Sequence, residues 1–120
     1  MIMRWLRLII LVSVAALVSV YPKSMDPGDI IAYPNPFKPY QDTLTIKPKA
    51  SATFAGSVKY IIYNYNQIEV YRGSTSNSAI QWSGFDQNGR AIPPGIYFVK
   101  IIQTNSLNET GSAYIKLIIQ

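Results

Sequence analysis

The strongest evidence for the fold lies in residues 96–119, IYFVKIIQTNSLNETGSAYIKLII. β-Branched and aromatic residues dominate both ends of this stretch, 96–104 and 112–119, and polar residues separate them. Such runs predict β-strands, whose successive side chains point to opposite faces. If Lys100 and Lys116 point to water, the alternate positions face a core. The residues predicted to face inward are Tyr97, Val99, Ile101, Ile115, Leu117 and Ile119.

The same pattern continues through the rest of the chain. Lys59, turned to water, would likewise place Val58, Tyr60 and Ile62 inward. We expect strands at Ile30–Tyr33, Thr43–Lys47, Ser57–Asn64, Ile68–Arg72, Ala79–Trp82, Ile96–Thr104 and Ser112–Ile119. The glycines and prolines fall in the gaps or at strand edges, as strands require: Gly56, Gly73, Gly84, Gly89, Gly95, Gly111, Pro34, Pro36, Pro39, Pro48, Pro93 and Pro94. The prediction is an all-β fold, a seven-stranded antiparallel Ig-like β-sandwich.

The first part of the chain has the composition of an export signal. Arg4 and Arg7 precede an uncharged run from Leu8 to Val20, which is shorter than the roughly 20 apolar residues of a bilayer-spanning helix. We expect a signal peptide at residues 1–20, a linker at 21–29 and the β-sandwich domain at 30–120, with an uncleaved anchor as the alternative. The protein would then be exported, to the periplasm, the cell surface or the medium.

Composition argues against several classes of function. The chain has 11 basic and 6 acidic residues, or 9 and 6 (+3) without Arg4 and Arg7, and it has no long basic run; we therefore expect no nucleic-acid partner. It contains no His and no Cys, which removes the usual general base, the thiol nucleophile and the commonest metal ligands. We expect no enzymatic activity, no catalytic residues, no cofactor and no metal. Contact with a membrane is expected only through the signal segment during export.

Two segments allow both a structural and a functional interpretation. Asp86-Gln87-Asn88-Gly89 resembles the start of a calcium loop, but Tyr97 stands where an EF-hand needs its bidentate Glu. A tight turn, capped by Asp86 and with a positive φ at Gly89, is favoured. Trp82 could stack on a ligand, yet it ends an apolar strand and is favoured as a core residue.

Five motifs in order resemble a known family. They are Tyr33-Pro34-Asn35-Pro36-Phe37, Ile62-Tyr63-Asn64, the W-x-G-x-D-x-x-G segment Trp82–Gly89, Pro94-Gly95-Ile96-Tyr97-Phe98 and Lys116-Leu117. The series resembles the FlgD-like Ig domain family, named for the flagellar hook-capping protein and close to the C-terminal sorting domains of type IX secretion cargo. The resemblance covers roughly residues 30–120. It implies an Ig-like module that serves long exported bacterial proteins as a structural unit or as an export tag; here only the expected signal and linker precede it.

The alternation has a second consequence. Turning the lysines outward also turns apolar residues outward on the third, sixth and seventh strands, which are neighbours in one sheet in the Ig-like order. A contiguous apolar patch of this kind usually marks a contact surface, unless the segment Tyr21–Asp29 or loops cover it. The candidate contact face consists of Lys59, Ile61, Tyr63, Phe98, Lys100, Tyr114 and Lys116.

Two functions fit this sequence. The first is an exported, non-catalytic structural or interaction module with a protein partner. The second is a sorting domain for type IX secretion, separated from its cargo, whose partner is the secretion machinery.

Overall fold

The computed structural model describes residues 29–105 and 107–120. The described residues form strands β1 (Ile30–Tyr33), β2 (Leu44–Pro48), β3 (Ser57–Asn64), β4 (Glu69–Ser76), β5 (Ile80–Trp82), β6 (Gly95–Thr104) and β7 (Thr110–Ile119). The predicted all-β, seven-stranded fold is confirmed. The predicted signal peptide and most of the predicted linker lie outside the described residues.

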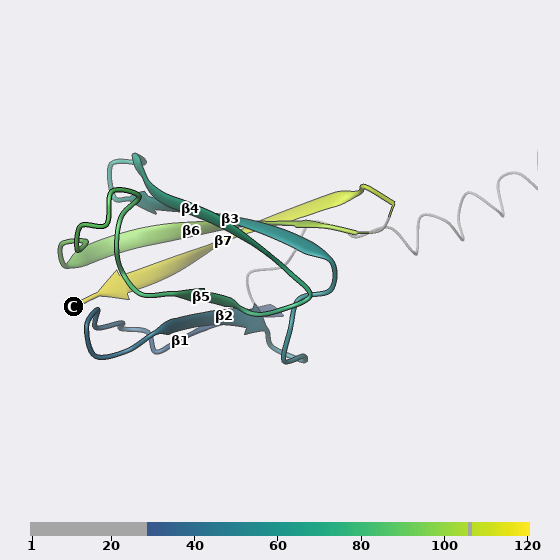
Figure 1. The fold of residues 1–120 in the computed structure, drawn as a ribbon, viewed down its shortest axis with the longest axis horizontal. Helices are drawn as coiled ribbons and strands as arrows, with labels where there is room; N and C mark the ends of the chain where they lie inside the picture. Colours follow the sequence, from purple (N-terminus) through teal and green to yellow (C-terminus); the bar gives the residue numbers. More distant parts are fainter. Residues whose placement is uncertain (1–28, 106) are drawn as a thin grey trace, which may run out of the picture.

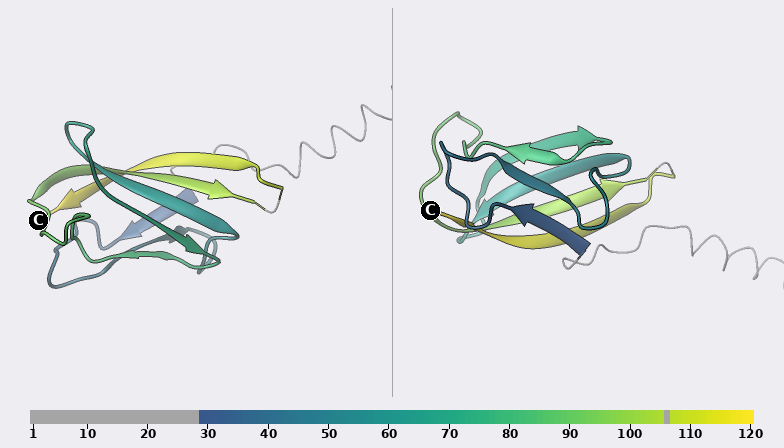
Figure 2. Two further views of the ribbon diagram at one scale, coloured as in Figure 1. Left: turned by 45° about the horizontal axis from the view of Figure 1, so that its top comes forward. Right: turned by 90° about the horizontal axis from the view of Figure 1, so that it is seen from below.

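The strands form two antiparallel sheets that pack face to face (Figure 1). One sheet has the order β1-β2-β5 and the other the order β4-β3-β6-β7, so the third, sixth and seventh strands are neighbours, as expected. Figure 2 shows the two sheets as separate layers, with the ends of β6 and β7 nearest their connecting turn projecting beyond the three-stranded sheet. Within residues 29–105 and 107–120, no helix has the length and hydropathy needed to cross a bilayer.

The core lies between the sheets and is built from the residues predicted to face inward. Val58, Ile62, Val99, Ile101 and Leu117 are completely buried, and Tyr60, Tyr97 and Ile119 are nearly so. Ile115 is half-buried and packs against the same cluster. The register inferred from the three lysines is therefore correct.

The expected position of Gly73 in a gap is wrong. Gly73 lies in the middle of β4, which extends to Ser76, and its cross-strand partner is Tyr60. A Cβ atom at Gly73 would stand 2.5 Å from the Tyr60 hydroxyl oxygen, inside the space that the tyrosine side chain occupies. Glycine is thus placed in this strand because an aromatic ring lies across its backbone. The other strand ends shift by up to two residues, apart from this longer β4.

The segment before β2 bonds to β7, which is the edge of the four-stranded sheet opposite β4. Phe37 is completely buried, its amide donates to the carbonyl of Ile118 (2.7 Å), and its carbonyl accepts from the amide of Gln120 (2.9 Å). The Asn35 side chain accepts a hydrogen bond from the Ile118 amide (3.0 Å) and donates one to the Lys116 carbonyl (3.1 Å). The Tyr33–Phe37 motif therefore closes one end of the β7 edge and positions a core phenylalanine.

A candidate contact face on the four-stranded sheet

Strand register brings the seven predicted contact residues onto one face. Ile61 pairs with Lys100, and Lys100 with Tyr114. One row along, Tyr63 pairs with Phe98, and Phe98 with Lys116. Cross-strand partners in an antiparallel sheet project to the same side. Lys59, opposite Ile102, lies in the row on the other side of Ile61. Together these residues lie on the outer face of the four-stranded sheet, called the contact face below.

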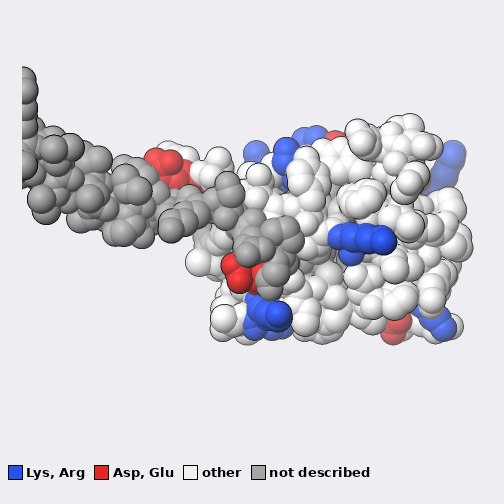
Figure 3. All heavy atoms as spheres, turned by 180° about the vertical axis from the view of Figure 1, so that it is seen from behind, with Lys and Arg blue, Asp and Glu red and all other residues white. Residues whose placement is uncertain are grey.

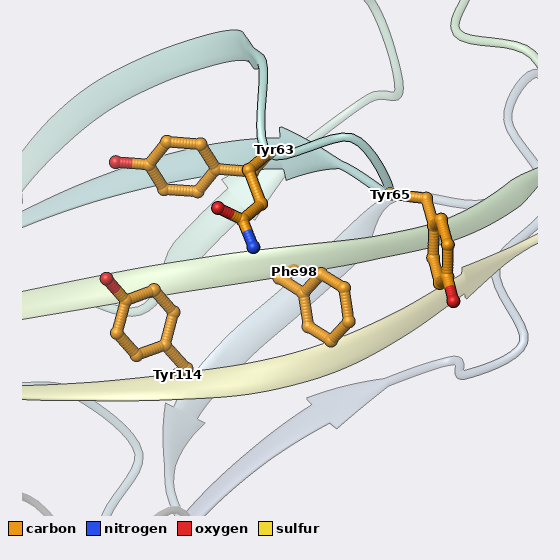
Figure 4. A pocket seen from close by; sticks show the side chains of 5 residues that line it. Tyr63, Tyr65, Phe98 and Tyr114 are labelled. Atoms are coloured by element: carbon orange, nitrogen blue, oxygen red, sulfur yellow. The ribbon is translucent and has the colours of Figure 1, made fainter.

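Aromatic side chains on this face surround a hollow of about 420 Å³. Its lining residues are Tyr63, Tyr65, Gln67, Phe98 and Tyr114. Figure 4 shows the four aromatic rings, with Phe98 between Tyr65 and Tyr114. The Tyr65 and Tyr114 side chains are 70% and 53% exposed, so large aromatic surfaces are available to a partner.

Sequence reasoning missed Tyr65 and Gln67, which belong to the turn between β3 and β4. The Asn64 side chain accepts hydrogen bonds from the amides of Asn66 (2.9 Å) and Ile68 (3.0 Å), and Gln67 has a φ of 64°. This Asn-centred turn holds Tyr65 beside the first residues of β6. The available signal was an aromatic residue inside an otherwise polar turn that directly follows a strand of the face.

The charge on the face is positive but dispersed. Lys100 Nζ lies 5.7 Å from the centre of the Tyr114 ring, a cation–π distance. Lys59 and Lys116 are exposed, whereas Arg72 is paired with Glu69 at 2.6 Å. The hydrogen bond from Arg72 lowers the pKa of the Glu69 carboxyl. On the side of the molecule seen in Figure 3, which views the two sheets from their edges, basic side chains stand in small separate groups, which differs from a continuous phosphate-binding stripe.

One member of the face is less accessible than expected. Ile61 is only 9% exposed, although it is not part of the core cluster. Its two cross-strand neighbours are Arg72 and Lys100, whose long aliphatic stems cover apolar surface beside them. The expectation that Ile61 is partly exposed was therefore wrong, and the accessible part of the face consists of Tyr63, Phe98, Tyr114 and the lysines.

The two ambiguous segments have the structural roles that were favoured. The Asp86 carboxylate accepts hydrogen bonds from the amides of Asn88 (2.9 Å) and Arg90 (2.8 Å), and Gly89 has a φ of 79°. Trp82 is 3% exposed, and its indole N–H donates to the Phe85 carbonyl at 3.0 Å. Among residues 29–105 and 107–120, no three His, Cys, Asp or Glu side chains gather as metal ligands would.

The architecture defines an Ig-like β-sandwich, and solved structures share it. PorZ, a bacterial surface component of the type-IX secretion system of Porphyromonas gingivalis, superposes with a TM-score of 0.58 at 21% identity, over 78% of this chain and 12% of PorZ. Dimeric latent PorU from the same organism gives 0.56 at 20% identity, over 76% of this chain and 9% of PorU. FlgD from Xanthomonas campestris, a structure related to the hook capping essential for flagellar assembly, gives 0.41 at 32% identity over 56% of this chain and 49% of FlgD.

PorZ and PorU share the two-sheet architecture of this chain, which confirms the predicted fold. The chain spans about a tenth of the length of PorZ and of PorU, so it corresponds to one module of each. No protein-family model matches the chain, and no curated protein sequence is similar to it.

Proposed function

We propose that the chain is an exported, non-catalytic interaction module that binds a protein partner through the contact face. The observation that carries this proposal is the group formed by Tyr63, Phe98 and Tyr114, three aromatic side chains on the side of the sheet away from the core. Aromatic residues beside a few cations are typical of binding surfaces rather than of ordinary solvent-facing sheets.

The absence of catalysis is part of the same proposal. The whole sequence lacks His and Cys, and its 6 acidic residues are dispersed. The carboxylates of Asp86 and Glu69 already cap a turn and pair with Arg72, respectively. An assembly role at the cell surface, in the periplasm or in the medium needs none of the missing groups.

The contact face is tested by photo-crosslinking in the producing cell. A crosslinking residue at position 114 should yield a discrete protein adduct, because the Tyr114 side chain is accessible. The matched control is position 81, since Gln81 is exposed on β5 in the other sheet. Adducts of equal yield from both positions, or adducts from position 81 alone, would contradict the proposal.

Export is tested separately by fractionation and by N-terminal sequencing of the recovered protein. We expect the chain in the envelope or medium with a new N-terminus near Ala16 or Ser19, the small residues in the second half of the uncharged run. A cytosolic chain that begins at Met1 would contradict export while leaving the contact face untouched.

A second candidate is the type IX sorting domain. It is favoured by the shared fold of one module of PorZ, a surface component of that secretion system. Residues 30–120 fused behind a reporter should then direct it out of a bacterium that has type IX secretion. Retention of the reporter in the periplasm would contradict this candidate and favour a free-standing module.

A further inference from the structure

Strand β7 is an edge of the four-stranded sheet, and its free side is closed along only part of its length. Along an antiparallel edge strand, the backbone N–H and C=O groups of every second residue bond to the paired strand. Those of the residues between them point to the free side. Lys116, Ile118 and Gln120 direct backbone groups to the free side, where Asn35 and Phe37 bond them. By the same alternation Thr110, Ser112 and Tyr114 also present their backbone N–H and C=O groups to that side.

The Thr110–Tyr114 part of this edge is open. Among residues 29–105 and 107–120, no backbone or side-chain group bonds Thr110, Ser112 or Tyr114 on the free side. All three residues are exposed. Figures 1 and 2 both show the ends of β6 and β7 nearest their connecting turn projecting past the three-stranded sheet. β1 pairs with β2 in that sheet and not with β7.

Exposed edges of this kind pair readily with a further strand unless they are protected. The usual protections are a proline, a bulge or a charged side chain on the edge. Thr110, Ser112 and Tyr114 provide none of these, and no bulge interrupts the pairing of β7 with β6. The other edge of the sheet is β4, where Gln87 bonds the amide of Arg72 and the carbonyl of Val70, and the strand then continues as Gly73-Ser74-Thr75-Ser76.

The open part of β7 is continuous with the contact face because Tyr114 belongs to both. A strand added there would place alternate side chains at about 5 Å from Ser112 and Tyr114 in direct cross-strand pairs, with Lys116 diagonally next to the residue opposite Tyr114. The charged neighbours on this side are Lys116 and Lys100. An added strand with acidic residues that reach these lysines, and an apolar or aromatic residue opposite Tyr114, complements both the charge and the hydrophobicity.

A second copy of the chain lacks that chemistry. The sequence of β7, TGSAYIKLII, contains no acidic residue to place opposite Lys116. Residues 29–120 carry 8 basic and 5 acidic residues, a difference of +3, so two copies also repel weakly. The charges favour a different, acidic chain.

We propose that β7 accepts an extended acidic segment of the partner protein as an added β-strand along Thr110–Tyr114, an inference that rests on the proposed contact face. Main-chain hydrogen bonds to the open edge supply affinity, and alternate side chains over Tyr114 and Lys116 supply specificity. The hollow beside Phe98 then takes the side chains that extend from the added strand across the face.

The test uses the purified protein and two synthetic peptides. Both alternate Thr with a second residue; in one the second residues are Glu and Tyr, and in the other Lys and Tyr. The acidic peptide should bind at least about tenfold more tightly, a difference of about 1.4 kcal/mol, and should protect the amides of Ser112 and Tyr114 from hydrogen exchange.

Ser112→Pro removes one outward N–H and no bond of the β6–β7 ladder, so it should lower affinity for the acidic peptide at least about tenfold. Ser112→Ala is the matched control and should bind like wild type. Lys116→Glu, which tests the charge without relying on a proline, should reverse the preference between the two peptides.

Several results would overturn this inference. They are absence of binding to the acidic peptide, equal binding by Ser112→Pro, and an unchanged preference in Lys116→Glu. A dimer in sedimentation that Ser112→Pro dissociates would assign the edge to a second copy. Protection of both amides without peptide, lost on deletion of residues 21–28, would assign it to the chain itself. If position 114 crosslinks to a partner and Ser112→Pro does not lower the yield of that crosslink, strand addition is rejected and the proposed function stands.

Discussion

The two faces of the four-stranded sheet are built from the same strands and differ in almost every physical respect. Along β6, Val99 and Ile101 are completely buried, whereas their neighbours Ile96, Phe98 and Lys100 point the other way and retain solvent contact. Along β7, Leu117 is buried while Tyr114 is 53% exposed. The inner face packs aliphatic side chains together with the rings of Tyr60 and Tyr97, and none of its described residues is charged. The outer face combines accessible aromatic rings with lysines.

This difference separates stability from function. Burial of the inner residues drives folding, because removing apolar surface from water is the main favourable contribution. Threonine, serine or lysine would serve the outer positions equally well as a solvated sheet surface. The proposed contact with a partner would account for Tyr63, Phe98 and Tyr114 on this face, which the fold alone does not require.

The largest effect is expected on the inner face. Val99→Glu would place a carboxylate in a completely buried site without a partner, at a cost of more than about 4 kcal/mol. Such a loss should unfold a domain of ordinary stability. Circular dichroism at 25 °C should show an unfolded chain; a cooperative thermal transition near that of wild type would contradict the assigned register.

A smaller effect is expected where β4 approaches Tyr60. Gly73→Val should cost about 2–3 kcal/mol, because the new side chain enters the space of the Tyr60 ring. The double variant Gly73→Val, Tyr60→Val should recover part of this loss by removing the ring. Urea denaturation measures both, and additive losses would show that the close approach is not the cause.

A turn outside both faces provides a reference for backbone strain. Gly89 has a φ of 79° with open space around it, so Gly89→Val should cost about 1–2 kcal/mol through conformation alone. Gly89→Asn should cost less, since asparagine tolerates this region. Equal melting temperatures for wild type and Gly89→Val would contradict the turn geometry.

The smallest inner-face effect depends on pH. Burial, with a contribution from Tyr71, raises the pKa of Tyr60 from 10.0 to about 12. The folded state holds the Tyr60 hydroxyl proton more tightly than the unfolded state does. The stability that this difference contributes to the fold is therefore complete below pH 10 and is lost as pH rises toward 12. Tyr60→Phe should flatten the fall in stability over that range, and an unchanged alkaline profile would contradict the assignment.

The extent to which the sequence predicts this molecule follows from the range of the interactions involved. Alternation is local, so three lysines placed the inner residues of β3, β6 and β7 correctly. The position of Gly73 depends on a tyrosine ring from the neighbouring strand, and Ile61 lies between Arg72 and Lys100, its partners on the two neighbouring strands. Tyr65 and Gln67 join the contact face through the Asn64 turn. These features arise from residues apart in sequence or from turn geometry, which periodicity does not encode.

The central claim, that the outer face serves binding rather than folding, is tested most directly by Phe98→Glu. Phe98 is half-buried on the contact face, beside the completely buried Val99. We predict that this variant folds, loses no more than about 1 kcal/mol in urea denaturation, and no longer yields the crosslink from position 114. An unfolded Phe98→Glu, with Val99→Glu still folded, would show that the two faces are exchanged and that the contact face does not exist.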